Sequence, residues 1–347
     1  MQIEDFIVPS DCSVIDAMRQ IDRNVRGIVY VCEDGRITGS LTDGDIRRFI
    51  LKNGDLGSSV GQIANRRMKA LTENEKDKAQ DVMRENGIRS VPVLDRHKRL
   101  REIYFEEGVC REKQQLHLPL VIMAGGKGTR LHPYTRILPK PLIPVGEKTI
   151  TEHIIGHFAE YGCTQVDMII NYKKNLIKAY FMDHEVTPKI HFVEEKEYLG
   201  TAGGLKLLEG RYESAFFMSN CDILVEEDYS DIVKFHRKQE NMVTMVCAVK
   251  QVGIPYGTVE VSSDGCATAI HEKPEVSFIT NTGLYLLEPE FLKHIPDHTF
   301  IHITDVIQKC IESGKRIGVY PVSEQRWLDM GQMDELKKMQ SVLENRV

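Results

Sequence analysis

The sequence predicts an α/β protein whose main part is an open sheet, mixed and mostly parallel, preceded by a smaller α+β unit. From residue 118 onward, short apolar runs alternate with amphipathic segments, the pattern of strands that alternate with helices. The first 112 residues instead show one order of short elements twice. Residues 106–115, EEGVCREKQQ, are polar and lack apolar periodicity, which predicts a linker. We therefore expect two parts, residues 1–112 and residues 117–347.

The first part contains two similar units with a period of roughly sixty residues. In the first unit we expect an extended segment at 6–8, a helix at 13–23, strands at 27–32 and 36–41, and a helix at 43–51. In the second we expect an extended segment at 68–72, a helix at 78–86, and strands at 89–94 and 99–104. The first helix is predicted from the spacing of four apolar residues, Val14, Ala17, Met18 and Ile21.

These units resemble a tandem CBS (Bateman) module, on the strength of residues 31–47, VCEDGRITGSLTDGDIR, and residues 90–95, SVPVLD. The resemblance implies an adenosine nucleotide whose phosphate contacts Thr42 and whose ribose contacts Asp45. The second unit has FEEG at residues 105–108 and lacks both groups, so we expect at most one such site. Thr42 or Asp43 capping the following helix is the alternative interpretation. The resemblance also implies a homo-oligomer formed through CBS pairs.

The second part begins with the most informative stretch, residues 118–146, LPLVIMAGGKGTRLHPYTRILPKPLIPVG. An apolar run at 118–123 predicts a buried strand. The glycine-rich turn that follows lets backbone N–H groups approach a ligand, and nearby cations suit a polyphosphate. Neither a P-loop nor a dinucleotide fingerprint fits, because Lys127-Gly128-Thr129 has the wrong order and Leu131 stands where a third glycine is required.

The whole stretch, AGGKGTRL followed by PKPLIPV, resembles the signature of the sugar-1-phosphate nucleotidylyltransferases. The resemblance implies a Rossmann-like, glycosyltransferase-A-like sheet that uses Mg²⁺ and binds an NTP and a sugar 1-phosphate. It implies that Arg130 grips the leaving pyrophosphate and that Lys140 neutralises phosphate charge. The residues expected to line the triphosphate are Ala124, Gly125, Gly126, Gly128 and Thr129.

The remaining elements are predicted from apolar spacing and from alternation of strand and helix. We expect helices at 149–161 and 176–182, and strands at 166–171, 189–194, 214–222, 243–249 and 280–285. A helix at 333–343 would follow Gly331. His153 and His157 lie four residues apart, a spacing that can bind a metal, but we interpret them as surface-facing polar residues of the first helix.

Five further short motifs match the same family in order: LGTAG (199–203), YG (256–257), EKP (272–274), NTG (281–283) and WLDMG (327–331). LGTAG implies nucleotide contacts at Leu199, Gly200, Thr201 and Gly203. Asp222 follows a buried strand, where an acid beside polyphosphate suits Mg²⁺, and Asp329 in WLDMG matches the family's second metal-binding aspartate. Lys273 is expected to neutralise the sugar phosphate. The residues implied to face the sugar phosphate are Tyr256, Gly257, Glu272, Lys273, Asn281 and Thr282.

Composition limits the classes of protein and partner. A formal net charge of −6 argues against a nucleic-acid partner. The chain has no apolar run of membrane-spanning length, and MQIEDFIVPSDCS lacks the features of a secretory signal. Eight cysteines form no Cys-x-x-Cys pair. These observations predict a cytoplasmic protein with no membrane partner.

The resemblance is strongest to bacterial guanylyltransferases that make GDP-activated amino sugars for legionaminic-type acids, so we expect GTP and glucosamine 1-phosphate. Mannose- or heptose-1-phosphate guanylyl transfer stays open, as do thymidylyl, cytidylyl and uridylyl transfer to glucose 1-phosphate. A nucleotide-sensing regulatory protein with an inactive transferase domain is a different class, disfavoured because the charged residues that the chemistry needs are present. A dinucleotide-dependent oxidoreductase is disfavoured by Leu131.

Overall fold

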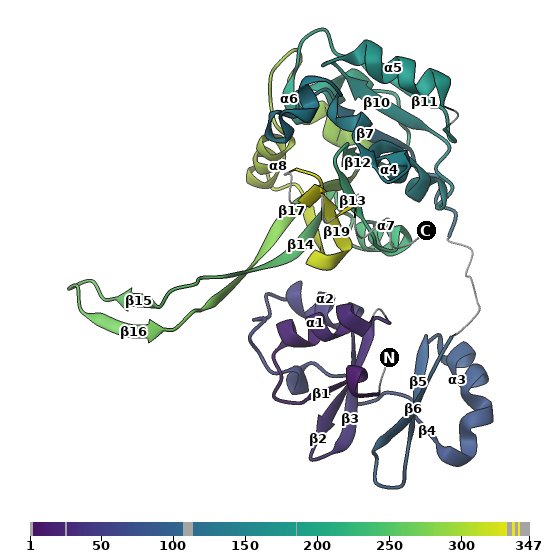
Figure 1. Cartoon of the computed structure of the whole chain (residues 1–347), viewed down its shortest axis with the longest axis vertical. Coiled ribbons are helices and arrows are strands. Elements are labelled where there is room, and N and C mark those ends of the chain that lie inside the picture. Colours follow the sequence, from purple (N-terminus) through teal and green to yellow (C-terminus); the bar gives the residue numbers. More distant parts are fainter. Residues whose placement is uncertain are drawn as a thin grey trace. The chain divides into compact units, whose positions relative to one another are not determined.

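The computed structural model describes residues 3–24, 26–106, 114–184, 186–331, 335–336 and 339–340. The chain divides into two compact units, Met1–Arg111 and Glu112–Val347 (Figure 1). Most of the predicted linker and of the helix expected at 333–343 lies outside the described residues. Within the described ranges no helix is long and apolar enough to cross a membrane. The seven cysteines of these ranges are free thiols.

The N-terminal unit contains one arrangement twice, as the repeat predicts. Each copy has a three-stranded sheet, in the orders β1-β2-β3 and β4-β5-β6. The middle strand pairs parallel with the first strand and antiparallel with the third. The first copy comprises η1 (Ile3–Phe6), β1 (Ile7–Pro9), α1 (Val14–Asn24), β2 (Ile28–Glu33), β3 (Arg36–Thr42), α2 (Asp43–Ile50) and η2 (Val60–Gln62). The second comprises β4 (Leu71–Thr72), η3 (Glu73–Lys78), α3 (Ala79–Asn86), β5 (Ser90–Leu94) and β6 (Leu100–Phe105).

The two copies pack against one another through apolar side chains. Phe6, Ile28 and Tyr30 of the first copy form one buried cluster with Leu100 of the second. The hydroxyl of Tyr30 also lies 3.3 Å from Oγ of Ser90. The repeat is therefore one folded body, with a core of its own.

The C-terminal unit is built on a seven-stranded sheet in the order β11-β10-β7-β12-β17-β14-β18. Four neighbouring pairs are parallel and the two pairs made by β17 are antiparallel, so the sheet is mixed and mostly parallel, as predicted. The strands are β7 (Leu120–Ala124), β10 (Val166–Ile170), β11 (Ile190–Glu194), β12 (Phe216–Asn220), β14 (Val243–Gly253), β17 (Glu275–Leu287) and β18 (Ile317–Ser323).

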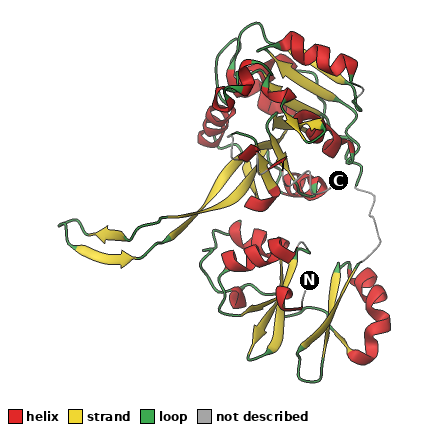
Figure 2. Cartoon of the chain, in the orientation of Figure 1, coloured by secondary structure: helices red, strands yellow, loops and turns green. Residues whose placement is uncertain are grey.

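Helices cover both faces of this sheet (Figure 2). Alternate residues of β7 show why: Leu120 and Ile122 belong to one buried cluster, whereas Val121 and Met123 belong to another. The first cluster includes apolar residues of α4, α5 and α7, and the second those of α6, η7, η8 and α8. The helices are α4 (Ile150–Ala159), α5 (Lys174–Asp183), α6 (Gly200–Gly203), α7 (Tyr229–Lys238) and α8 (Ile303–Glu312).

Smaller elements complete this unit. Two short antiparallel pairs are β8 (Pro144–Val145) with β9 (Lys148–Thr149), and β13 (Ile223–Val225) with β19 (Trp327–Asp329). Strands β14 and β17 run beyond the sheet and lead to a third pair, β15 (Thr258–Val261) and β16 (Ala267–His271), which stands away from the sheet (Figure 1). The 3-10 helices are η4 (Thr129–Leu131), η5 (Tyr134–Arg136), η6 (Lys140–Leu142), η7 (Gly204–Leu208), η8 (Pro289–His294) and η9 (Glu324–Arg326).

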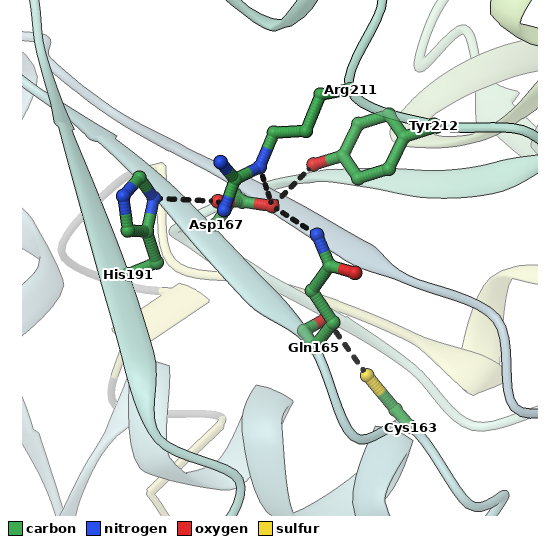
Figure 3. Close-up of polar contacts among 6 residues, drawn as sticks. All are labelled: Cys163, Gln165, Asp167, His191, Arg211 and Tyr212. Atoms are coloured by element: carbon green, nitrogen blue, oxygen red, sulfur yellow. Dashed lines mark hydrogen bonds and ion pairs between the residues drawn. The ribbon is translucent and has the colours of Figure 1, made fainter.

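A buried carboxylate ties together the amino ends of the outer strands. Asp167, the second residue of β10, is fully buried. It contacts the side chains of Arg211 at 2.7 Å, Tyr212 at 2.6 Å and His191 of β11 at 2.8 Å (Figure 3). Gln165 supplies a further bond of 3.0 Å. These four partners satisfy the carboxylate, so we assign this cluster to the stability of the fold.

Candidate active site

Two aspartates from distant parts of the chain meet beyond the carboxyl end of β12. Strands β13 and β19 pair antiparallel, with Ile223 opposite Asp329. The backbone N–H of Met330 donates to the carbonyl oxygen of Asp222 at 2.8 Å. Asp222 therefore lies in the turn between β12 and β13, rather than at the end of one strand from 214 to 222 as predicted, because the chain leaves the sheet after Asn220. The short β13–β19 pair is what brings Asp329 beside Asp222.

Lys140 lies against this acidic pair. Prolines on both sides of it hold the start of η6, and its ammonium group forms an ion pair with Asp222. Both side chains are 11% exposed, so this is a largely desolvated contact. The cation neutralises one carboxylate of a pair that would otherwise place two negative charges in a buried site.

The pKa of Asp329 is shifted by burial and by the charges around it. Burial raises the pKa of Asp329, and the neighbouring negative charge of Asp222 raises it further. Lys140 and Arg130 act in the opposite direction, which shows that both cations belong to the same electrostatic site. Arg130 itself is exposed, on η4. The four charged side chains predicted from separate motifs, Arg130, Lys140, Asp222 and Asp329, thus act on one another.

The donor set fits a magnesium ion. Magnesium takes one or two carboxylates from the protein and completes its shell with water and substrate phosphate oxygens. In the described part of the chain no cluster of three or more His, Cys, Asp or Glu side chains forms a metal site of protein ligands alone. Asp222 and Asp329 therefore suit a metal shared with phosphates and do not suit a closed structural metal site.

The glycine-rich turn packs directly on this cluster. Gly128 has φ of +63°, and a Cβ there would lie 3.0 Å from Thr135 and 3.2 Å from Cβ of Lys140. The hydroxyl of Thr135, which is buried, donates to the carbonyl oxygen of Gly128 at 2.8 Å. Only glycine fits this position. The turn is thus held against the lysine that contacts Asp222, with the exposed Thr129 and Arg130 following it.

A buried glutamate that the sequence interpretation missed joins the two glycine loops. Glu195 directly follows β11 and is 1% exposed. A Cβ on Gly125 would lie 2.5 Å from its Oε2, and a Cβ on Gly204 would lie 2.5 Å from its Oε1. The same rule that selects Asp222, an acid just after a strand, could have found it.

The carboxyl group of Glu195 keeps an open acceptor. Its Oε1 lies 3.4 Å from the backbone nitrogen of Leu199, but among the described residues Oε2 has no hydrogen-bond partner. Burial raises its pKa to about 7. A buried polar atom without a partner is costly unless a ligand satisfies it, so we treat Glu195 as a binding residue.

The LGTAG loop packs closely against the segment that leads into α8. Gly200 has φ of +81° and a Cβ there would lie 2.5 Å from the carbonyl oxygen of Ile301. The hydroxyl of Thr201 accepts a 3.0 Å bond from the backbone N–H of Ile303 at the start of α8. The helix that this loop opens, α6, has only four residues and continues as η7, so its dipole is short. Leu199 and Gly203 complete the loop, which lies next to Glu195 through Leu199 and Gly204.

The residues predicted to face the sugar divide into two groups. Asn281 and Thr282 lie in β17, where the buried hydroxyl of Thr282 donates to the carbonyl oxygen of Val246 at 2.7 Å across a β-bulge. The other four lie at the base of the β15–β16 hairpin, away from the Asp222 cluster (Figure 1). Those four are exposed, Tyr256 by 75%. They are Tyr256, Gly257, Glu272 and Lys273.

The structure also shows the local surroundings of two predicted pairs, Thr42 with Asp45 and His153 with His157. Thr42 and Asp45 form a capping box at the start of α2: Asp45 Oδ2 accepts from the hydroxyl of Thr42 at 2.6 Å and from its backbone N–H at 3.0 Å. Their adenosine contact stays a prediction. The interpretation of His153 and His157 as surface-facing is wrong, because both are half-buried. His153 lies 2.9 Å from the carbonyl oxygen of Val145, and His157 packs edge-on against Tyr229.

Comparison with known proteins assigns the family. A family model described as nucleotidyl transferase matches residues 120–346, and one described as CBS domain matches residues 1–52. The chain therefore belongs to the nucleotidyl transferase family, and it carries a CBS domain at its N-terminus. This agrees with the loop, the paired aspartates and the repeated N-terminal unit described above.

Curated relatives include enzymes named for different substrates. A mannose-1-phosphate guanyltransferase of Aspergillus fumigatus is 35% identical over 185 residues, 50% of this chain and 50% of that protein. A bifunctional protein GlmU of Methanococcus maripaludis is 32% identical over 210 residues, 57% and 48% of the two chains. A UTP–glucose-1-phosphate uridylyltransferase of Synechocystis is 28% identical over 236 residues, 62% and 60% of the two chains. The chain spans about half the length of the first two.

Solved structures confirm the fold of the C-terminal unit. HddC from Yersinia pseudotuberculosis superposes with a TM-score of 0.52 at 22% identity, covering 65% of this chain and 99% of that one. A crystal structure of HddC complexed with GMP-PN matches with the same TM-score at 21% identity. At these identities the likeness shows that the sheet and its helices have the same arrangement.

Proposed function

We propose that this chain transfers a nucleotidyl group from an NTP to a sugar 1-phosphate, giving an NDP-sugar and pyrophosphate. The proposal rests on the convergence of four charged side chains beside the glycine-rich turn at 124–130, in which Gly128 has a positive φ. They are Arg130, Lys140, Asp222 and Asp329. Family membership and the names of the curated relatives support it. Nucleotide-sugar synthesis of this kind feeds the building of cell-surface polysaccharide.

The reaction needs alignment and charge neutralisation more than proton transfer. An oxygen of the sugar phosphate, already anionic, attacks the α-phosphorus of the NTP, and the bond to the bridging oxygen of pyrophosphate breaks. Arg130 binds the leaving pyrophosphate, and backbone N–H groups of the glycine turn hold the triphosphate. Lys140 moves its charge from Asp222 to phosphate oxygens when both substrates are bound. Mg²⁺ held by Asp222 and Asp329 would supply charge stabilisation between the two reactants.

The nucleobase that we propose is guanine, and Glu195 supports this choice. Guanine presents two adjacent N–H donors on its pairing edge, N1–H and the 2-amino group, which an ionised carboxylate accepts together. Uracil and thymine present a single N–H donor between two carbonyl acceptors, which would face the carboxylate with repulsion. The buried Oε2 of Glu195, without a partner in the described part of the chain, thus favours GTP.

The sugar that we propose is glucosamine 1-phosphate, on the resemblance of the motifs to the guanylyltransferases of legionaminic-type acid synthesis. The residues proposed to hold it are those of the hairpin base with Asn281 and Thr282. For the hairpin residues this role requires that the hairpin reach the phosphate site in the working enzyme, because they lie away from the Asp222 cluster in the structure.

The test is pyrophosphate release with each of four NTPs, offered with glucosamine, mannose or glucose 1-phosphate and Mg²⁺. We expect release with GTP and glucosamine 1-phosphate. Release with another pair of NTP and sugar 1-phosphate would support the proposed reaction and contradict the proposed substrates. A folded protein silent with every pair, and with AMP or ATP added, would favour a regulatory protein with an inactive transferase domain.

A further inference from the structure

A cavity of about 590 Å³ opens between two turns of the N-terminal unit. One turn joins β2 to β3 and the other joins β5 to β6, so each copy of the repeat contributes one wall. We call it the turn cavity. The residues that line it are Glu33, Asp34, Arg36, Thr38, Arg96, His97 and Lys98.

Backbone contacts hold the two walls of the turn cavity in place. The N–H of Ile37 donates to the carbonyl oxygen of Lys98 at 2.8 Å, which joins the two turns directly. In the second turn, Asp95 accepts bonds from the backbone N–H groups of His97 at 2.8 Å and Arg99 at 2.9 Å. Arg101 contacts the other oxygen of Asp95 at 2.8 Å. None of these contacts uses the side chains that face the cavity, so the cavity is formed before any ligand enters.

The charges that line the turn cavity are unbalanced. Within the residues described, the three cations Arg36, Arg96 and Lys98 have no ion-pair partner, although the whole chain has a net charge of −6. Of the two acids, Glu33 already contacts Arg66 at 3.4 Å, which leaves Asp34. The three cations are exposed, so water weakens their mutual repulsion, and an anion between them would turn the remaining repulsion into attraction.

The turn cavity is separate from the capping residues of α2. Strand β3 runs from Arg36 to Thr42 and is about 20 Å long, so Thr42 is at its other end and Asp45 lies just after it, in α2. The side chains of Thr42 and Asp45 bond to each other, and Arg48 also contacts Asp45. A ligand of the turn cavity would not touch them.

We propose that the turn cavity binds an anion that carries a diphosphate group. The planar guanidinium groups of Arg36 and Arg96 suit the paired oxygens of phosphate, and Lys98 adds a third charge. Asp34 is placed to accept hydroxyl groups, as those of a ribose or another sugar. The volume is in the range of sites for nucleotide-sized ligands, roughly 300–1,000 Å³. Free pyrophosphate, a nucleoside triphosphate and a nucleotide sugar share this chemistry.

Hydrogen–deuterium exchange of the full chain, followed by mass spectrometry, separates this site from the catalytic one. The probes are pyrophosphate, ATP, GTP and a GDP-sugar, each compared with sulfate at equal ionic strength. We expect slower exchange in the peptides that cover residues 33–38 and 95–99. The double variant Arg36→Ala with Lys98→Ala should weaken this protection at least about tenfold in probe concentration, since each lost charged contact is a large share of the affinity. Protection of residues 124–130 reports the catalytic unit separately.

The control variant is Lys52→Ala with Lys69→Ala, two exposed lysines of the same unit that do not line the cavity. It should keep the protection at both turns. The probe that acts at the lowest concentration identifies the source of the diphosphate. Protection that sulfate reproduces, protection that survives in Arg36→Ala with Lys98→Ala, or unchanged turns with every probe would each overturn the proposal. Because the readout is binding at these turns, it does not depend on nucleotidyl transfer.

Discussion

At the scale of single residues, the site depends on a few buried charges. Lys140 and Asp222 are 82 positions apart in sequence and form a largely desolvated ion pair. Glu195 is buried, and one of its oxygens has no hydrogen-bond partner among the described residues. Such groups are costly for folding alone, so their presence beside the two glycine loops makes them candidate binding and catalytic residues.

Replacing Asp222 by asparagine should remove turnover and leave the fold intact. The amide keeps the size of the side chain but loses the charge that holds the metal and positions Lys140. We expect pyrophosphate release to fall by at least about 10²-fold, as for loss of a charge-stabilising group. Asp231→Asn, on the exposed side of α7, is the matched control. Normal turnover in Asp222→Asn, with an unchanged melting curve, would remove Asp222 from the metal site.

Replacing Glu195 by glutamine should change the preference among nucleobases. An amide has one acceptor oxygen where the carboxylate has two, so GTP loses the paired contact, while uracil gains a donor for its carbonyl oxygen. We expect the ratio of kcat/KM for GTP and UTP to fall roughly 10- to 100-fold, the discrimination of one bidentate base contact. Glu194→Gln is the control, because that neighbour is exposed and paired with Lys174 at 2.6 Å. An unchanged ratio would place the base elsewhere.

The ionisation of Glu195 predicts how the use of GTP depends on pH. Its pKa is raised to about 7 by burial, so the ionised form that accepts guanine is lost as the pH falls through this value. We expect kcat/KM for GTP to decrease below about pH 7 and Glu195→Gln to lack this step. A flat wild-type profile between pH 6 and 8 would contradict the proposed contact.

At the scale of elements, Asp167 joins strands β10 and β11 to the segment before β12. Hydrogen bonds from Tyr212, Arg211 and Gln165 outweigh the effect of burial and lower its pKa below the ordinary value of 3.8. A lowered pKa contributes stability that is present above the unfolded pKa and is lost as the pH falls through the folded pKa. This contribution should therefore begin to decrease below about pH 4 and be lost completely only below the lowered pKa of the folded state.

Asp167→Asn tests this element. The substitution leaves Arg211 without its anion. We expect the free energy of unfolding at pH 7 to fall by roughly 3 kcal/mol. This is the low end of the range for broken buried pairs, because Arg211 is partly exposed. The variant should also lack the wild-type loss of stability in acid. Urea unfolding at pH 7 and pH 3.5 measures both. Equal stability of the two proteins at pH 7 would show that the cluster is incidental.

The β15–β16 hairpin is the element whose position the motifs do not explain. Val259 and Ile270 are cross-strand partners on one exposed apolar face, and Glu260 and His271 form a 3.2 Å contact on the polar side. A two-stranded hairpin with an uncovered apolar face gains stability when it packs against another surface. Closure over the catalytic site would give Lys273 its proposed role.

Lys273→Ala should therefore raise KM for the sugar phosphate by about tenfold, the value of one charged phosphate contact, and leave the affinity for GTP unchanged. Lys309→Ala, on the exposed face of α8, is the control. Steady-state kinetics with the sugar phosphate varied at saturating GTP measures the effect. A KM equal to that of the wild type would show that other residues hold this phosphate.

At the scale of the whole molecule, each unit has a hydrophobic core of its own. In the described residues the clusters of the C-terminal unit lie between residues 118 and 339, and those of the N-terminal unit between residues 3 and 105. We therefore expect residues 114–347 to fold and release pyrophosphate when expressed alone. Circular dichroism and the pyrophosphate assay check this. A truncated protein that is unfolded would show that the N-terminal unit is needed for folding.

The sequence by itself determined the family and the order of elements, and it predicts the residues of the proposed phosphate site. Local spacing carries these signals: the glycine turn at 124–130, the Pro-Lys-Pro at Lys140, and an acid after a buried strand at Asp222. The repeat of the first part also follows from local patterns, because each copy alternates the same short elements.

Only the tertiary structure decided which of these residues meet. The β13–β19 pair joins Asp329 to Asp222, and the meeting of two glycine loops buries Glu195, although it looks like one of four charged residues in a surface segment, EEKE. The turn cavity combines turns some sixty residues apart, and the β15–β16 hairpin, which Lys273 follows, stands away from the sheet. The physical reason is that burial and Coulomb energy depend on distances through space, which contacts between remote segments set.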